Sequence, residues 1–97
     1  MQHSLQTLRQ ALAQNKAIKA IAGIANFDQD LVLKLAQASE QAQIPAIDVA
    51  CDAALIRAAK SVYSGTVFAS AITMADFETA LEAGADALEL GNFDALY

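Results

Sequence analysis

The sequence predicts an α/β fold in which parallel strands alternate with helices. Short apolar runs alternate along the 97 residues with stretches whose apolar side chains recur at helical spacing. Polar turns follow the apolar runs at intervals of about 20–24 residues, which suits repeated strand–helix units. The apolar runs are almost continuous, as is typical of parallel strands that are covered on both faces.

An N-terminal helix is predicted first, from Ser4 to Gln14, followed by a (βα)₃β arrangement. The four strands are expected at residues 17–27, 46–50, 66–72 and 87–90. Three helices connect them, and their expected inward faces are, in order, Leu31, Leu35, Ala38 and Ala42; Leu55, Ala58, Ala59 and Val62; and Phe77, Ala80 and Leu81.

Capping residues mark where these helices begin and end. Asp28 and Asp52 precede two of the helices as natural N-caps, and Thr73 with Asp76 resembles a capping box at the third. Helix ends are expected near Pro45, Gly65 and Gly84.

The composition excludes several classes of function. The chain is 56% hydrophobic, yet no apolar run reaches the roughly 18–20 residues that span a bilayer. Six scattered basic residues against eleven acidic ones argue against nucleic acid as a partner. One His and one Cys offer no metal-ligand spacing. The chain start lacks a secretory signal pattern, so we expect a cytoplasmic protein without a membrane segment.

Two architectures fit the strand–helix alternation. A doubly wound sheet usually has a glycine-rich phosphate turn after its first strand, whereas only Gly23 stands there. A (β/α)₈ barrel has no such requirement, and the Asn-Phe-Asp sequence at 26–28 recurs at 92–94, as expected of equivalent turns on one rim. We therefore predict half of a barrel: residues 1–97 form the N-terminal half of a single barrel domain, with a leading helix at 1–16 and the strand–helix units at 17–97.

Three segments also resemble a known family. Residues 19–28, 47–50 and 84–94 are similar, in order and spacing, to an uncharacterised TIM-barrel family of cyanobacteria and algal plastid genomes, a domain of unknown function that is typically more than twice as long. The resemblance implies a barrel and a cyanobacterial or plastid origin, and hence the plastid stroma if the gene is in a plastid. It implies no established reaction and no known cofactor.

Strand alternation makes a few charged side chains conspicuous. Asp48 and Glu89 each lie between apolar neighbours that must face the helices, so both carboxylates are expected to point into the barrel. Lys19 can share this inward face, with Ser70 as an additional donor. One interpretation is a buried structural network, because an unpaired charge in a dry interior is costly. The other is that Asp48 or Glu89 acts as a general acid or base near the C-terminal rim.

Further candidates lie at the same rim. Asn26 and Asn92 could hydrogen-bond a ligand beside helix N-termini, or they could simply shape their turns. Lys19 and Ser70 complete the candidate ligand-binding residues. Cys51 directly precedes Asp52, whose carboxylate opposes formation of a thiolate.

Three functions stay open from the sequence. The chain could be an inactive fragment of a barrel protein that binds or converts a small phosphorylated or anionic metabolite at its C-terminal rim. It could be a half-barrel that pairs with a second copy. It could also belong to a non-catalytic regulatory or scaffolding barrel. The expected partners are the missing C-terminal half or a second copy, together with a small-molecule ligand.

Overall fold

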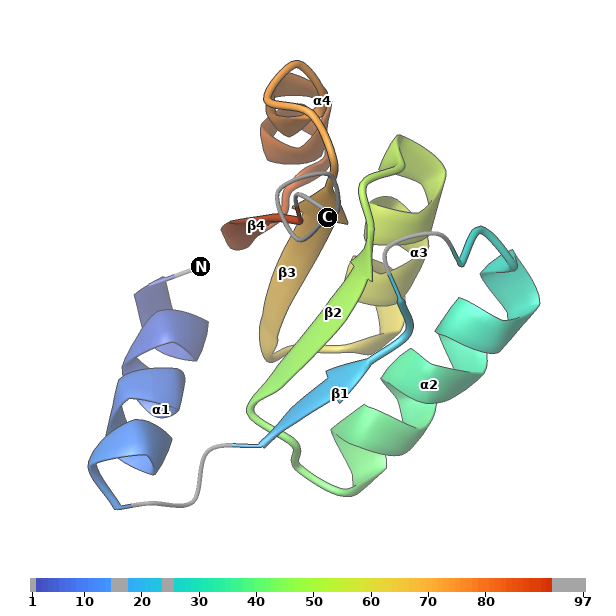
Figure 1. Cartoon of the computed structure of the whole chain (residues 1–97). Coiled ribbons are helices and arrows are strands. Elements are labelled where there is room, and N and C mark those ends of the chain that lie inside the picture. Colours follow the sequence, from blue (N-terminus) through green and yellow to red (C-terminus); the bar gives the residue numbers. More distant parts are fainter. Residues whose placement is uncertain (1, 15–17, 24–25, 92–97) are drawn as a thin grey trace.

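Four parallel strands form one sheet, with helices between them. The computed structural model describes residues 2–14, 18–23 and 26–91, with side chains from residue 5 onward. The elements are, in order, α1 (Gln2–Ala13), β1 (Lys19–Ile21), α2 (Gln29–Gln41), β2 (Ala46–Ala50), α3 (Ala53–Val62), β3 (Thr66–Ala71), α4 (Asp76–Ala83) and β4 (Ala87–Leu90). Figure 1 shows α2, α3 and α4 along one side of the sheet and α1 on the other side.

The strand order follows the chain. The sheet runs β1-β2-β3-β4, and every neighbouring pair is parallel. This arrangement confirms the α/β class and is consistent with half of a barrel. β2 and β4 have the predicted bounds, whereas β1 is much shorter than the apolar run that predicted it.

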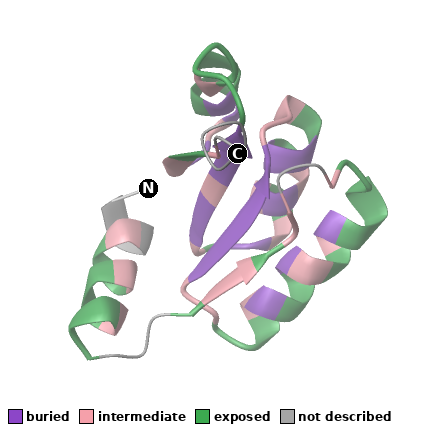
Figure 2. Ribbon diagram, viewed as in Figure 1, coloured by how far each residue is buried: buried purple, intermediate pink, exposed green. Residues whose placement is uncertain are grey.

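The two faces of the sheet differ in chemistry. The face toward α2–α4 carries the core, in which Ile47 and Val49 of β2 and Val67 and Ala69 of β3 are fully buried. Figure 2 shows this burial concentrated in β2 and β3 at the middle of the sheet. Strand alternation turns Asp48 toward the opposite face, which we call the inner face.

Two of the three N-terminal helix caps predicted from the sequence are confirmed. The carboxylates of Asp28 and Asp52 accept from the backbone N–H groups of Leu31 and Leu55, at 3.2 and 3.1 Å. The prediction of a capping box formed by Thr73 and Asp76 was wrong. Its hydroxyl donates to the Asp76 carboxylate at 2.9 Å, but α4 begins only at Asp76 and has no side-chain cap. The pair therefore braces the turn that precedes the helix.

The inward face of α2 was also predicted wrongly. Val32, Ala36 and Ser39 are the buried residues of this helix, whereas Leu31 is 50% exposed. Both sets of residues recur at helical spacing, so the spacing alone does not show which of the two faces the sheet. The stripe that begins at Leu31 continues through Leu35 beside the outer edge of β1, where both residues line a hollow.

Apolar side chains are likewise exposed at the other edge of the sheet. Leu90 of β4 is 48% exposed, and Leu81 of α4, which was predicted to face inward, is 60% exposed. On α4 the small residues Ala80 and Ala83 are buried instead. Both edge strands thus carry apolar surface that the described residues leave uncovered.

Gly65 marks a close approach between a turn and an aromatic ring. A Cβ at this position would overlap the phenol oxygen and ring of Tyr63. The ring is itself fixed, because its hydroxyl donates to the Ile44 carbonyl at 2.6 Å. We therefore expect Gly65→Ala to lower the free energy of unfolding by about 2 kcal/mol through overpacking, as measured by urea denaturation.

Gly84 provides the matched control for this prediction. Gly84 ends α4 at a φ of 101°, and the nearest atom to an added Cβ is 3.9 Å away. Gly84→Ala therefore tests the cost of a left-handed conformation alone, about 1 kcal/mol. A Gly65→Ala variant as stable as the wild type would contradict the close approach.

Candidate functional site

Four polar side chains, one from each strand, form a connected group on the inner face. They are Lys19 on β1, Asp48 on β2, Ser70 on β3 and Glu89 on β4, and we call them the inner-face cluster. The Ser70 Oγ lies 2.5 Å from Asp48 Oδ1 and 3.1 Å from Glu89 Oε2. The Lys19 ammonium donates to Glu89 Oε1 at 3.0 Å. The sequence candidates Lys19, Asp48, Ser70 and Glu89 are therefore all brought together.

Strand register explains how the side chains meet. Ser70 pairs directly with Glu89 on β4 and with Ala50 on β2, two residues beyond Asp48. Ser70 therefore lies between the two carboxyl groups. Lys19 pairs with Ala46, at the N-terminal end of β2. Its long side chain reaches across the sheet to Glu89 on β4. The same ammonium lies 4.6 Å from the centre of the Phe68 ring, at cation–π distance.

The two carboxyl groups have opposite electrostatic environments. Burial raises the pKa of Asp48, and the charge of Glu89 raises it further, against the lowering effects of Ser70 and Lys19. The pKa of Glu89 is lowered, mainly by its hydrogen bond from Lys19 and also by Ser70, although partial burial opposes this. Paired groups whose pKa values move apart are a recognised feature of acid–base sites.

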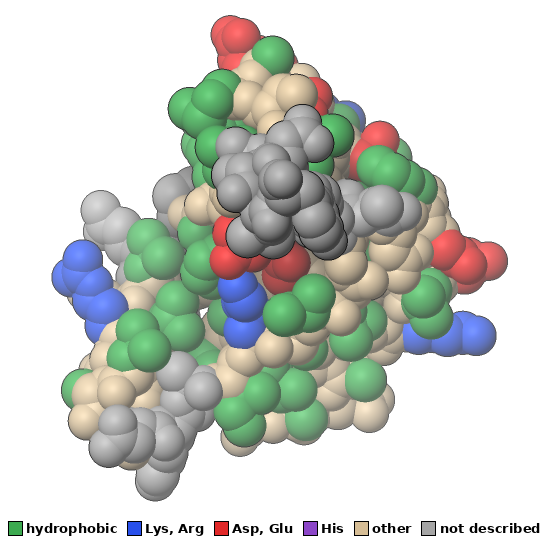
Figure 3. Space-filling view, viewed as in Figure 1, with side chains coloured by type: hydrophobic (Ala, Val, Ile, Leu, Met, Phe, Trp, Pro, Cys, Tyr) green, Lys and Arg blue, Asp and Glu red, His purple; other side chains and the backbone are tan. Residues whose placement is uncertain are grey.

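The cluster extends from a buried part of the inner face to an accessible one. Asp48 is 3% exposed, whereas the side chain of Glu89 is 47% exposed. Figure 3 shows acidic and basic side chains meeting near the middle of this view, beside hydrophobic ones. Glu89 is the penultimate residue of β4, so its carboxylate lies near the C-terminal ends of the strands.

The two asparagine candidates have different outcomes. The Asn26 amide donates to the Ala22 carbonyl, and its oxygen accepts from the Asp28 N–H, both at 3.1 Å. The Asn26 side chain thus forms hydrogen bonds within its own turn, one of them with the N-cap residue Asp28. It is not part of the inner-face cluster. Asn92 lies outside the described residues.

Cys51 has the surroundings of an unreactive thiol. Its Sγ donates to the Asp76 carbonyl at 3.0 Å. Burial raises the thiol pKa, and the charges of Asp76 and Asp52 raise it further. Within the described residues, no group of three or more His, Cys, Asp or Glu side chains could hold a metal ion. None of the helices described there is long and apolar enough to cross a membrane.

One important acidic residue was not identified from the sequence. The Asp86 carboxylate is fully buried; it accepts from the Val67 N–H at 3.0 Å and from the Lys60 ammonium at 3.1 Å. Asp86 lies between the Gly84 cap and the start of β4. An acidic residue directly before the apolar run of β4 was the available signal, but its partners come from β3 and α3.

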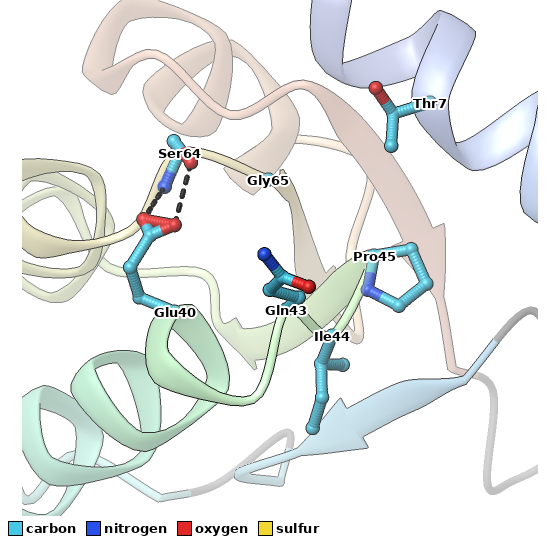
Figure 4. Close-up of a pocket in the computed structure, with 7 residues that line it drawn as sticks. All are labelled: Thr7, Glu40, Gln43, Ile44, Pro45, Ser64 and Gly65. Carbon is cyan, nitrogen blue, oxygen red and sulfur yellow. Dashed lines mark hydrogen bonds between the residues drawn. The ribbon is translucent and has the colours of Figure 1, made fainter.

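A hollow of about 400 Å³ lies at the other end of the strands. Residues from α1, the end of α2, the α2–β2 connection and the turn before β3 line it: Thr7, Glu40, Gln43, Ile44, Pro45, Ser64 and Gly65. Figure 4 shows the Glu40 carboxylate bonded to the Ser64 hydroxyl and N–H, at 2.7 and 2.9 Å. No residue of the inner-face cluster lines this hollow or the one of about 370 Å³ beside β1.

Comparison with known proteins identifies relatives whose function is equally open. Residues 1–97 match the family described as "Protein of unknown function (DUF561)". The "Uncharacterized protein ycf23" of Cyanidium caldarium is 36% identical over 86 residues, which cover 89% of this chain and 34% of the relative. The protein of the same description from Cyanophora paradoxa is 38% identical over 87 residues, covering 89% and 36%. That from Antithamnion sp. is 37% identical over 90 residues, covering 93% and 32%.

The lengths and sources of these relatives complete the comparison. The chain matches their N-terminal portion and spans about a third of their length. The relatives come from algae, in agreement with the resemblance seen in the sequence. No solved structure matches the chain. The chain belongs to the DUF561 family of proteins of unknown function.

Proposed function

We propose that the inner-face cluster is an acid–base site for a small anionic metabolite at the C-terminal rim of a barrel. The observation that carries this proposal is the pairing of Asp48 and Glu89 through Ser70. One carboxyl group is buried and favours its neutral form, and the other is accessible and favours its charged form. Such a pair supplies an acid and a base side by side.

The anionic character of the substrate is supported by Lys19. Its side chain is about a quarter exposed, and its ammonium is the cation in the cluster. A carboxylate or phosphate placed beside this ammonium would share it with Glu89. In this proposal Lys19 holds the substrate, and the two carboxyl groups move protons to and from it.

Barrel closure is the second part of the proposal. The exposed apolar side chains at both edges of the sheet, such as Leu31 and Leu90, support it. Further strand–helix units of the longer family members are the proposed occupants, because the matched relatives extend well beyond the matched segment. Added strands would pair with β1 and β4 and enclose the inner face. A second copy of the chain is the alternative occupant of these edges.

The test is a pair of isosteric variants in a full-length family member. Small phosphorylated and carboxylated metabolites are screened by thermal shift, and any compound that binds is then assayed for conversion. Asp48→Asn and Glu89→Gln should each reduce turnover by about 100-fold or more while changing affinity little. Glu82→Gln is the control, because it removes an exposed carboxylate on α4. Asp48→Asn that loses stability but keeps full turnover would reject the catalytic role.

A structural role of the cluster is the second candidate, and one observation favours it. Among the described residues, no buried side-chain nitrogen or oxygen lacks a hydrogen-bond partner. The cluster is therefore satisfied without a ligand, as in a regulatory or scaffolding barrel. Under this alternative, Asp48→Asn and Glu89→Gln would change the unfolding free energy, and no screened metabolite would raise the melting temperature.

A further inference from the structure

The hydroxyl group of Ser70 has two acceptors and a single hydrogen. Its Oγ is within hydrogen-bond distance of one oxygen from each carboxyl group, at 2.5 Å to Asp48 and 3.1 Å to Glu89. A hydroxyl donates one hydrogen bond and can accept others. If both carboxyl groups were ionised, one of these short contacts would hold no hydrogen. One more proton, on Asp48 or on Glu89, would make both contacts hydrogen bonds.

We infer that Asp48 carries this proton and that Ser70 is a relay residue, which accepts from Asp48 and donates to Glu89. The hydrogen bonds then run in one direction along the cluster. The protonated Asp48 Oδ1 donates to Ser70 Oγ, and the Ser70 hydroxyl donates to Glu89 Oε2. The Lys19 ammonium donates to Glu89 Oε1. Each of the three polar contacts in the cluster then contains one hydrogen.

The surroundings of the two carboxyl groups determine which one is protonated. Asp48 is almost fully buried, and none of the cations in the described part of the chain forms an ion pair with it. Glu89 is accessible and has the Lys19 ammonium at 3.0 Å. Lys19, on the neighbouring strand β1, and Glu89, on β4 beyond β3, are the charged groups that act on Asp48 within the sheet. The described charged side chain of α1, Arg9, is exposed. Desolvation and the charge of Glu89 both favour neutral Asp48.

The relay makes a balanced proton transfer possible. When Asp48 gives its proton to Ser70 Oγ, the Ser70 hydroxyl gives its own proton to Glu89. Asp48 becomes ionised, Glu89 becomes neutral, and Ser70 is unchanged. A buried acid thus exchanges protons with the accessible surface of the inner face. The use of this exchange in catalysis rests on the proposed function, whereas the position of the proton is a property of the free protein.

The order of titration tests the position of the proton. Carbon-13 NMR of Asp and Glu carboxyl groups in the full chain, assigned with Asp48→Asn and Glu89→Gln, follows both residues without any ligand. We expect Asp48 to release its proton at higher pH than Glu89, although free aspartate is the stronger acid, with a pKa of about 3.9 against 4.3. Titration of Asp48 below Glu89 overturns the inference.

Substitution of Ser70 tests the relay. In Ser70→Ala, Glu89 loses a donor to its charged form, so its pKa should rise by about one unit. Ser70→Thr keeps the hydroxyl and should restore the wild-type value. Ser39→Ala is the matched control, because it removes another buried serine from α2, on the other side of the sheet. An unchanged Glu89 pKa in folded Ser70→Ala contradicts the relay.

The two proposals can fail separately. A wild-type titration with Asp48 above Glu89, together with full turnover in Asp48→Asn, leaves the relay in place and rejects the acid–base function. The reverse result, with ordinary titration but lost turnover, rejects the relay alone. If Ser70→Ala does not fold, the order of titration in the wild type still decides where the proton lies.

Discussion

Asp86→Ala is expected to lower the free energy of unfolding by about 3 kcal/mol. The Asp86 side chain is 0% exposed and accepts from both the Val67 N–H and the Lys60 ammonium. Its removal leaves the N–H of a fully buried valine without this acceptor. Lys60 is 33% exposed, so water compensates much of its loss, and the orphaned backbone group dominates the cost. Urea denaturation at neutral pH measures the effect.

Two further variants sharpen the Asp86 prediction. Asp86→Asn keeps an oxygen that can accept from Val67, so it should recover part of the lost stability. Glu82→Gln changes an exposed carboxylate of α4 and should stay within about 0.5 kcal/mol of the wild type. Equal stability of Asp86→Ala and the wild type would show that β3 does not depend on this carboxylate.

Stability is expected to fall at alkaline pH because of Tyr63. Burial raises the pKa of Tyr63 to about 12, with smaller contributions from the charges of Glu40 and Asp86. An unfolded tyrosine has a pKa of about 10. Below pH 10 the phenol is neutral in both states and its contribution is fully present. Between pH 10 and 12 the unfolded state ionises first, so the free energy of unfolding should fall by up to about 2.7 kcal/mol.

The comparison with Tyr63→Phe isolates this effect. The variant loses the hydrogen bond to the Ile44 carbonyl, which lowers stability by about 1 kcal/mol at every pH below 10. Above pH 10 the wild type should lose its advantage, because phenylalanine does not titrate. Lysine titration is common to both proteins and cancels in the difference. Urea denaturation from pH 8 to 11.5 gives the two curves, and parallel curves would contradict the prediction.

The face on which the charged strand residues lie could be predicted, because successive side chains of a strand alternate between its two faces. An acid between two apolar residues, as in Ile47-Asp48-Val49, can bury both neighbours only by facing away from the helices. The same argument placed Glu89 on the inner face, and register then brought Ser70 between the two carboxyl groups. Asp28 and Asp52 were predictable as caps because capping is local in sequence.

Features that depend on distant partners could not be predicted in this way. The buried stripe of α2 is decided by which neighbour covers which side, and periodicity alone does not distinguish Leu31 from Val32. Lys19 lies early in β1, yet its side chain is long enough to reach β4. Asp86 depends on Lys60, 26 positions earlier in the chain, and on the backbone of β3. These contacts follow from tertiary packing, which short sequence patterns do not record.

The Lys19–Glu89 ion pair has a consequence for how the sheet opens. It joins the first and last strands across 70 positions of sequence, so it exists only when all four strands are assembled. β4, like β1, contains no fully buried residue, and two of its four residues are exposed. Local detachment of β4 would carry the Glu89 carboxylate away and leave Lys19 facing Asp48. Opening would therefore free the Lys19 ammonium from its ion pair and remove the Glu89 charge that raises the pKa of Asp48.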